Sequence, residues 1–180
     1  MKLVWASGAL AVVLLTVGTL LGNAGMNLLN GGGGGDAIYG KGGMDTLPGG
    51  GGADRFYFDT TPGAGNVDLI TDFLPGTDRI YLDDDAFTGI GPVGVLDAAA
   101  FVAGVATTAA QRIIYDAGSG SLYFDADGSS SGAAPLQFAT LGAASHPVIS
   151  AANFQITGCA LRAPRRGRGH SMRNDPRGGC

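Results

Sequence analysis

The sequence contains no glutamate, and all fifteen of its acidic residues are aspartate. It has only two cysteines, Cys159 and Cys180, and two histidines, His146 and His170. Because both cysteines lie near the C-terminus, the rest of the chain can form neither an internal disulfide nor a thiolate metal site. The sequence has no H-E-x-x-H motif, which excludes a zinc protease of that type.

Charged residues of either sign are also scarce, at 14% of the chain against 45% hydrophobic residues. This balance excludes a highly charged disordered chain. Residues 1–158 hold fourteen Asp against five Lys and Arg, whereas residues 159–180 hold six Arg against one Asp. The acidic body is unlike a nucleic-acid binder, and no nucleic-acid partner is expected. Short carboxylates that can act from within tight turns instead favour a hard cation.

Both ends of the chain differ from the body. After Lys2, nineteen uncharged and mostly apolar residues follow, so residues 1–21 are typical of a signal peptide. A membrane anchor, a partly buried strand and the stub of a truncated reading frame are alternatives, the last because Leu20 is in phase with the repeat described next. Residues 159–180 are expected to be a disordered basic tail, either a solvated appendage or a segment that binds anionic lipid or nucleic acid.

Residues 22–57 contain four consecutive nine-residue repeats, which begin at Gly22, Gly31, Gly40 and Gly49. Position four is always Gly, position six is Asn or Asp, and position eight is large and apolar. In chain order, positions six and eight are occupied by Asn27 and Leu29, Asp36 and Ile38, Asp45 and Leu47, and Asp54 and Phe56. A flexible linker has no reason to keep these three chemistries in phase.

The period predicts a coiled chain. Six glycine-rich residues can turn the backbone sharply, and the last three residues of each repeat can run as a short strand. Two repeats then make one coil of about eighteen residues, with position eight in a shared interior. Successive coils place Asn27 beside Asp45 on one edge and Asp36 beside Asp54 on the other.

Carboxylates held one strand spacing apart repel unless a cation lies between them. Ca²⁺ fits such a site because it accepts six to eight oxygens in flexible geometry, whereas Mg²⁺ demands a strict octahedron. Zinc is disfavoured because the repeat has neither His nor Cys. A segment so rich in glycine pays a high entropic cost of ordering, so we expect its folding to be coupled to calcium binding.

These repeats resemble the repeats-in-toxin, or haemolysin-type, calcium-binding proteins, whose signature G-G-x-G-x-D-x-U-x forms a parallel β-roll. The resemblance implies that carbonyls at positions two and four join the side chains at position six. In this chain those carbonyls belong to Asn23, Gly25, Gly32, Gly34, Lys41, Gly43, Gly50 and Gly52. Asn27, Lys41 and Pro48 depart from the signature, so the site that joins Asp36 and Asp54 is expected to be the stronger.

Residues 58–158 are expected to form a mostly antiparallel β region that caps the roll. Alternating patterns predict strands at 56–59, 67–73, 79–82, 136–139 and 153–157, and a hairpin of 112–116 with 121–125. The alanine-rich stretch 97–110 favours one short helix. The expected fold class is therefore all-β, a short parallel β-roll of nonapeptide repeats with this cap.

The segments 68–80 and 122–128 resemble the C-terminal region of serralysin-type secreted metalloproteases. In that family the region caps the roll and, with the chain end, directs export through a type I secretion channel. Asp68, Asp72 and Asp78 are candidates for a further cation site, although solvent-facing strand positions are the plainer interpretation. Residues 83–85 and 125–128 are expected to be acidic turns, the latter without the glutamate that an EF-hand needs.

The sequence supplies no recognisable catalytic centre, so we expect a protein that is not an enzyme. The favoured function is an extracellular calcium-binding module whose roll folds on Ca²⁺ binding and serves the folding and secretion of an exported protein. A stand-alone calcium-dependent adhesin or matrix protein is the alternative, with a cell-surface or polysaccharide ligand. A glycosidase that uses paired aspartates is a weak third. Export machinery, reached by a type I or a signal-peptide route, is the other expected partner.

Overall fold

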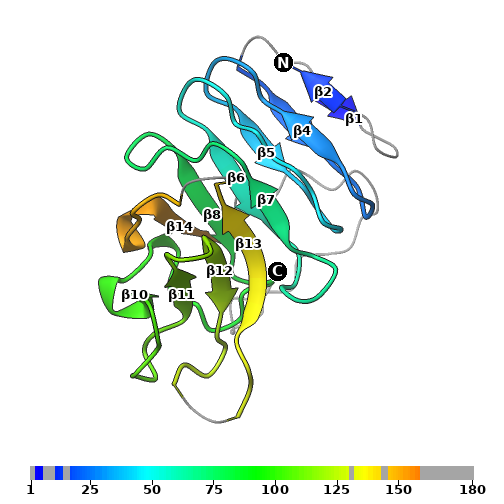
Figure 1. The fold of residues 1–180 in the computed structure, drawn as a ribbon. Coiled ribbons are helices and arrows are strands. Elements are labelled where there is room, and N and C mark those ends of the chain that lie inside the picture. The colour runs from blue at the N-terminus through cyan, green and yellow to red at the C-terminus, as the bar shows by residue number, and fades with distance from the viewer. Residues whose placement is uncertain (1–2, 6–10, 14–16, 130–131, 143–145, 159–180) are drawn as a thin grey trace, which may run out of the picture.

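The computed structural model describes residues 3–5, 11–13, 17–129, 132–142 and 146–158 of the chain. The predicted basic tail, both cysteines and much of the signal-like segment lie outside these residues. In the described part the protein is almost entirely β, with stacked coils at one end and a cap at the other (Figure 1). This confirms the predicted all-β fold class.

The nine-residue repeats form the coils of a parallel roll. Three repeats contribute the strands β4 (Leu28–Asn30), β5 (Ala37–Tyr39) and β6 (Arg55–Phe58). Ala37 pairs with Arg55, which confirms the eighteen-residue coil. The third repeat makes only an isolated bridge at Thr46. Pro48 in that repeat has no N–H to donate to a neighbouring strand. Its carbonyl still accepts a hydrogen bond from the Gly31 amide.

The first wall of the roll is a seven-stranded sheet in the order β1-β3-β5-β6-β8-β14-β9. Its remaining strands are β1 (Leu3–Trp5), β3 (Thr19–Leu21), β8 (Arg79–Asp83), β14 (Phe154–Thr157) and β9 (Gly94–Val95). Leu20 pairs with Ile38 and is fully buried, so the roll extends to residues before Gly22. Two of the alternatives for residues 1–21, the partly buried strand and the stub of a truncated reading frame, both agree with this observation.

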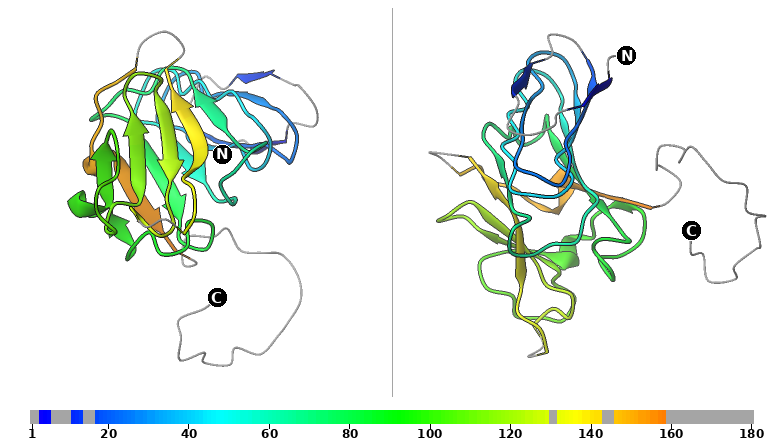
Figure 2. Two further views of the ribbon diagram at one scale, coloured as in Figure 1. Left: turned by 60° about the horizontal axis from the view of Figure 1, so that its bottom comes forward. Right: turned by 90° about the vertical axis from the view of Figure 1, so that its right-hand side faces the viewer.

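The second wall begins with β2 (Ala11–Val13) beside β4 and continues through bridges from Leu28 to Thr46 and from Thr46 to Leu69. Leu69 lies in a five-stranded sheet of order β10-β11-β12-β13-β7. Its strands are β7 (Asp68–Ile70), β10 (Phe101–Ala103), β11 (Ile113–Asp116), β12 (Ser121–Phe124) and β13 (Leu136–Leu141). The two walls of the roll thus continue into the cap, as the two views of Figure 2 show.

One hydrophobic core runs through the roll and the cap. Position eight of every repeat is buried, as predicted, and Leu29, Ile38, Leu47 and Phe56 are each at most 1% exposed. Successive side chains of a strand point to opposite faces, so each three-residue strand of the roll directs only its middle side chain into the core. On the outer face of the first wall, Tyr57 stacks between Tyr39 and Tyr81 as cross-strand neighbours, with centroid distances of 4.2 and 4.5 Å.

The cap differs from prediction in two respects. The predicted helix over 97–110 is wrong, because the chain forms only a 3₁₀ turn, η1 (Ala98–Ala100), before β10; the cap's other 3₁₀ turn, η2 (Ala151–Asn153), precedes β14. The high helix propensity of alanine is outweighed in this stretch because β10 pairs with β11. The cap was also predicted to be mostly antiparallel, but it contains both parallel and antiparallel strand pairs. The β11-β12-β13 pairs and the β9–β14 pair are antiparallel, whereas β7–β13, β8–β14 and β10–β11 are parallel.

No helix among the described residues is both long and apolar enough to cross a membrane.

The packing generates a stability prediction. Ile38→Ala should lower the free energy of unfolding by about 2–5 kcal/mol, because it opens a cavity in the middle of the roll. Val148→Ala, at a side chain that is 92% exposed, should change it by less than about 0.5 kcal/mol. Urea denaturation of both variants in millimolar calcium measures the difference. Equal effects would contradict the assignment of position eight to the core.

Candidate metal centre

The glycine-rich turns of the second, third and fourth repeats adopt backbone conformations that L side chains avoid. The φ angle is positive at Gly32 and Gly34 in the second repeat and at Gly50 and Gly52 in the fourth. These are positions two and four, from which the family resemblance takes its carbonyl ligands. A methyl group on Gly52 would collide with the Gly34 carbonyl of the coil before, so these positions also require glycine for space.

A ladder of hydrogen bonds joins the side chains at position six along one edge of the roll. The Asp36 main-chain amide donates to Asp54 Oδ1 at 2.8 Å, and the Asp54 amide donates to Asp78 Oδ1 at 3.0 Å. Below them, the Gly18 amide donates to Asp36 Oδ1 at 2.6 Å. Asp36, Asp54 and Asp78 therefore form what we call the Asp36 ladder, in which each carboxylate binds the amide of the preceding coil.

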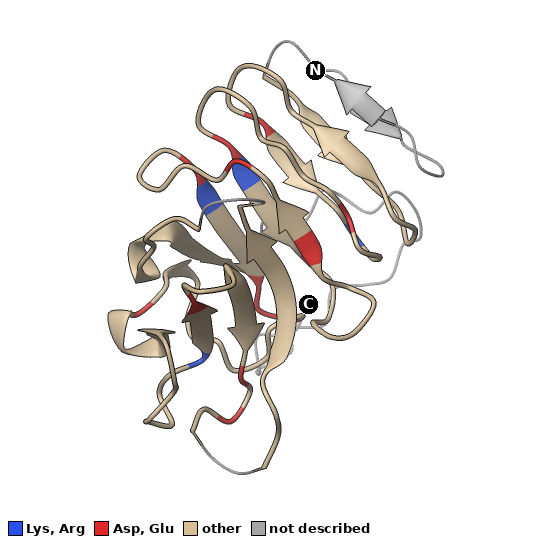
Figure 3. Ribbon diagram, in the orientation of Figure 1, with Lys and Arg blue, Asp and Glu red and all other residues tan. Residues whose placement is uncertain are grey.

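The other edge carries the same arrangement with one neutral member. The Asn27 amide donates to Asp45 Oδ1 at 2.7 Å, and the Asp45 amide donates to Asp68 Oδ1 at 3.0 Å. We call Asn27, Asp45 and Asp68 the Asn27 ladder. The two ladders confirm the predicted neighbours, Asn27 with Asp45 and Asp36 with Asp54. Figure 3 shows the acidic positions of the roll along its edges, where the strands begin.

Each carboxylate in the repeats has a second oxygen that is left without a partner. Asp36 Oδ2, Asp45 Oδ2 and Asp54 Oδ2 are buried and have no hydrogen-bond partner among the residues that the structure describes. An unpaired buried carboxylate oxygen carries a large desolvation cost, which a bound cation would remove. These three atoms are the most direct structural sign of a missing positive charge.

The glycine at position one forms the floor beneath these oxygens. A methyl carbon on Gly40 would lie 2.6 Å from Asp45 Oδ2 and 2.9 Å from Asp68 Oδ2, so both carboxylates face the same spot. On the other edge, a methyl carbon on Gly31 would lie 2.8 Å from Asp36 Oδ2 and 2.5 Å from the Gly49 carbonyl oxygen. Glycine thus keeps open a space lined by oxygens.

Burial raises the pKa of the aspartates in both ladders, because the carboxylates are kept from water. Burial raises the pKa of Asp45 to about 6, against the hydrogen bond from the Asn27 amide, which lowers it. Burial raises the pKa of Asp68 to about 7, and the nearby charge of Asp45 adds to the rise. Burial likewise raises the pKa of Asp36, Asp54 and Asp78. All five groups would become easier to ionise beside a cation.

The donor set fits a hard cation that accepts many oxygens. No cluster of three His, Cys, Asp or Glu side chains able to hold a metal is present in the described part of the chain. A metal would therefore be held by paired position-six side chains together with main-chain carbonyls. Three of the carbonyls that the resemblance assigns already accept hydrogen bonds, those of Asn23 and Gly32 from the amides of Gly42 and Gly51, and that of Lys41 from the Thr60 hydroxyl. A carbonyl oxygen has a second lone pair for a further contact.

Asp68, Asp72 and Asp78 do not form the single additional site that was considered from sequence. The structure places Asp68 on the Asn27 ladder and Asp78 on the Asp36 ladder, both buried. Asp72 is exposed, and its two oxygens accept hydrogen bonds from the amides of Gly49 and Gly50. The solvent-facing interpretation therefore holds for Asp72 and is wrong for the other two.

Lys41, which departs from the repeat signature, has its own partners. Its φ is 74°, a left-handed conformation that costs a non-glycine residue about 1 kcal/mol. Its ammonium group forms an ion pair with Asp59 and lies 5.2 Å from the centroid of the Tyr39 ring. The positive charge of Lys41 is thus directed to Asp59 and Tyr39, whereas the corresponding position of the second and fourth repeats is glycine.

Sequence reasoning missed the role of position one, and it grouped Asp68 and Asp78 with Asp72 as a separate candidate site instead of placing them on the ladders. The constant glycine at positions 22, 31, 40 and 49 was visible, but its reason, contact with the carboxylate, needed coordinates. Asp68 and Asp78 follow Asp45 and Asp54 by 23 and 24 residues, so they fall outside the eighteen-residue spacing.

Comparison of the chain with protein-family models and with curated proteins gave no match. Among solved structures, the chain is similar to the solution structure of the AlgE6R3 subunit from the Azotobacter vinelandii mannuronan C5-epimerase. The two are 26% identical over 89% of this chain and 90% of that chain, with a TM-score of 0.41. A likeness this loose carries no argument, so the fold and the site rest on the geometry above.

The raised pKa values predict that the metal-free protein is more stable in mild acid. Unfolded aspartates titrate near pH 4, so between about pH 4 and 7 the folded chain retains protons that the unfolded chain releases. Stability should therefore fall as the pH rises through the folded pKa values of Asp45 and Asp68. The strand signal in circular dichroism of the metal-free protein, followed from about pH 5 to about pH 8, measures this loss of folded protein.

Asp68→Asn provides the control, because its amide oxygen can still accept the Asp45 N–H while the charge is removed. This variant should be more stable than the parent in metal-free buffer at about pH 8 and should lose less strand signal as the pH rises. Metal-free stability that is unchanged or increases over this range would contradict the description of the ladders.

Proposed function

We propose that the roll is a calcium-binding module that completes its folding when Ca²⁺ enters the two ladders. The observation that supports this most directly is the set of unpaired, buried Oδ2 atoms of Asp36, Asp45 and Asp54 above an open glycine floor. When bound, the ion would supply the positive charge that these oxygens lack. The chain itself holds the carboxylates at coil spacing and keeps water away from their inner sides.

Calcium is the cation that this donor set favours. The available ligands are all oxygens, from carboxylates, from the Asn27 amide and from main-chain carbonyls of the glycine turns. Ca²⁺ accepts six to eight such ligands with variable geometry, whereas Mg²⁺ retains its waters and demands an octahedron. The proposed ligands are the position-six side chains with the carbonyls at positions two and four. Asp68 and Asp78 extend the position-six set by one layer.

The proposed role is non-catalytic and extracellular. Sites of modest affinity remain empty at cytosolic calcium levels and fill at the millimolar levels outside cells. A roll that is unstable without the ion could therefore leave the cell as an unfolded chain and fold after export. We propose that the chain serves in this way as the folding and secretion module of an exported protein.

Titration with calcium tests the proposal. The metal-free protein at about pH 8 should lose much of its strand signal in circular dichroism, and millimolar CaCl₂ should restore it. Asp54→Asn should weaken calcium binding by at least about tenfold in titration calorimetry, because it removes one charge from the Asp36 ladder. Asp116→Asn, at an exposed acidic position outside the roll, serves as the control for net charge.

A pair of glycine substitutions tests whether the space that the position-one glycine leaves beside the carboxylates is needed, without changing any charge. Gly49→Ala would place a methyl carbon 2.5 Å from Asp54 Oδ2, whereas Gly51→Ala would meet no atom within 4 Å. Neither glycine has a positive φ, so the two substitutions differ in the atoms that the added methyl group meets, which for Gly49 also include Phe56 Cζ at 3.0 Å. Calcium affinity should fall in Gly49→Ala and persist in Gly51→Ala. No heat of binding in the parent protein would refute the proposal.

A further inference from the structure

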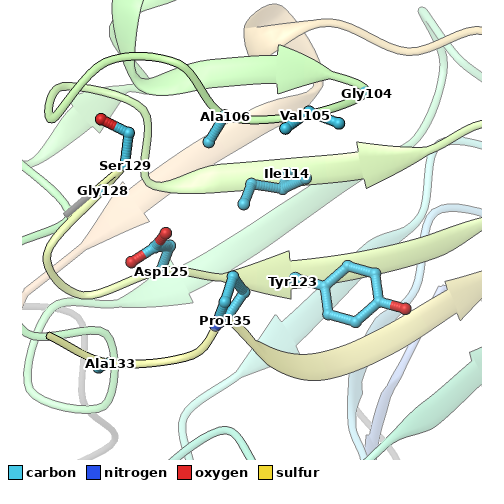
Figure 4. A pocket seen from close by; sticks show the side chains of 10 residues that line it. All are labelled: Gly104, Val105, Ala106, Ile114, Tyr123, Asp125, Gly128, Ser129, Ala133 and Pro135. Atoms are coloured by element: carbon cyan, nitrogen blue, oxygen red, sulfur yellow. The ribbon is translucent and has the colours of Figure 1, made fainter. Parts of the chain in front are cut away.

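The outer face of the second wall contains a hollow that has no part in the proposed calcium sites. Its volume is about 450 Å³, within the range of small-molecule sites. Ile114 on β11 and Tyr123 on β12 are direct cross-strand partners and line it, as do Val105 and Pro135 (Figure 4). The strand residues on either side of Ile114 are buried in the core, which fixes Ile114 on the outer face.

Hydrogen bonds between the flanking segments build one end of the hollow. The Asp125 amide donates to the Arg112 carbonyl at 2.8 Å, and Arg112 Nη1 donates to the Ala126 carbonyl at 2.6 Å. The Ser129 amide donates to the Thr108 carbonyl at 3.3 Å. These contacts tie the segment before β11 to the turn after β12, so the hollow is a built feature of the fold.

A buried carboxyl group faces this largely apolar space. Asp125 lines the hollow, is 3% exposed and has no ion-pair partner within the described residues. Its Oδ1 accepts a hydrogen bond from the Asp127 amide at 3.2 Å. Burial raises the pKa of Asp125, and a side-chain hydrogen bond with Asp127 raises it further. Asp127 Oδ1 is also buried and lacks a partner there. Asp125 and Asp127 thus lie side by side, and neither has an ion-pair partner among the described residues, although the guanidinium of Arg112 binds the intervening Ala126 carbonyl.

We propose that this hollow binds an ammonium or guanidinium group on a short aliphatic stem, with the cation against Asp125 and the stem over Ile114 and Tyr123. Calcium is a poor occupant, because the walls are mainly carbon and offer too few oxygens. A neutral sugar could donate hydrogen bonds but would leave the charge of Asp125 uncompensated. An organic cation satisfies both the charge and the apolar walls.

Two sources could supply this chemistry. One is a small free amine, and the other is an arginine of residues 159–180, which contain six of them. Both present a delocalised or compact positive charge on a flexible apolar stem. The site is the same in either case, and the experiment distinguishes the sources.

The test uses the full chain in millimolar calcium and follows backbone amides by NMR. Butylammonium and butylguanidinium should each cause saturable shifts at the amides of Val105 and Tyr123, with at least about tenfold higher affinity than neutral butanol. Asp125→Asn should lose this preference, whereas the charge-matched control Asp116→Asn should keep it. Addition of a synthetic peptide of residues 159–180 tests the second source. Shifts at the same amides would assign the site to the chain's own arginines, and shifts with the free amines alone would assign it to a small ligand.

Equal affinity for butanol and the two cations would overturn the proposal. This comparison uses the unmodified protein, so it decides the question even where Asp125→Asn fails to fold. A preference for cations that survives in a folded Asp125→Asn protein would overturn it as well. None of these outcomes depends on calcium binding by the ladders, provided that the chain is folded in the buffer.

Discussion

The structure depends on one repeated contact, the hydrogen bond from a main-chain amide to the aspartate carboxylate of the next coil. It appears between Asp36 and Asp54 on one edge and between Asn27 and Asp45 on the other. Within the repeats the contact joins residues eighteen apart, and the same contact to Asp68 and Asp78 spans 23 and 24 residues, so it aligns successive coils even where the loop between them is longer. It also uses just one carboxylate oxygen, so the other oxygen is held inward without a partner.

The rest of the roll can be understood as the accommodation of these carboxylates. Glycine at position one leaves room beside them, and in the second and fourth repeats glycines of positive φ at positions two and four turn the chain around them. The apolar side chain at position eight then packs into a core shared with the cap. The cost of this design is electrostatic, since each added coil buries more negative charge. A module of this kind is therefore expected to be stable only where cations or protons are available.

The cap continues the geometry of the roll after the repeat has ended. Asp68 and Asp78 occupy ladder positions, although the loops before them are longer than a repeat. Strands β8 and β7 extend the two walls and carry the cap strands beside them. The proposed calcium sites lie along the edges of the roll, and the hollow lies on the outer face of the cap sheet. The two proposed binding functions thus draw on separate groups of residues.

Much of the roll could be predicted from the sequence, because the nine-residue period is a local pattern and each conserved position of the repeat has one type of side chain. The period alone determined the eighteen-residue coil, the buried row from Leu29 to Phe56, and the neighbours Asn27 with Asp45 and Asp36 with Asp54. Only the tertiary structure decided that Asp68 and Asp78 join these ladders, that residues 97–110 form no α-helix, and that Asp125 faces a hollow. Each of these features depends on pairing between segments that are joined by loops of irregular length, and a local sequence pattern does not show which segments pair.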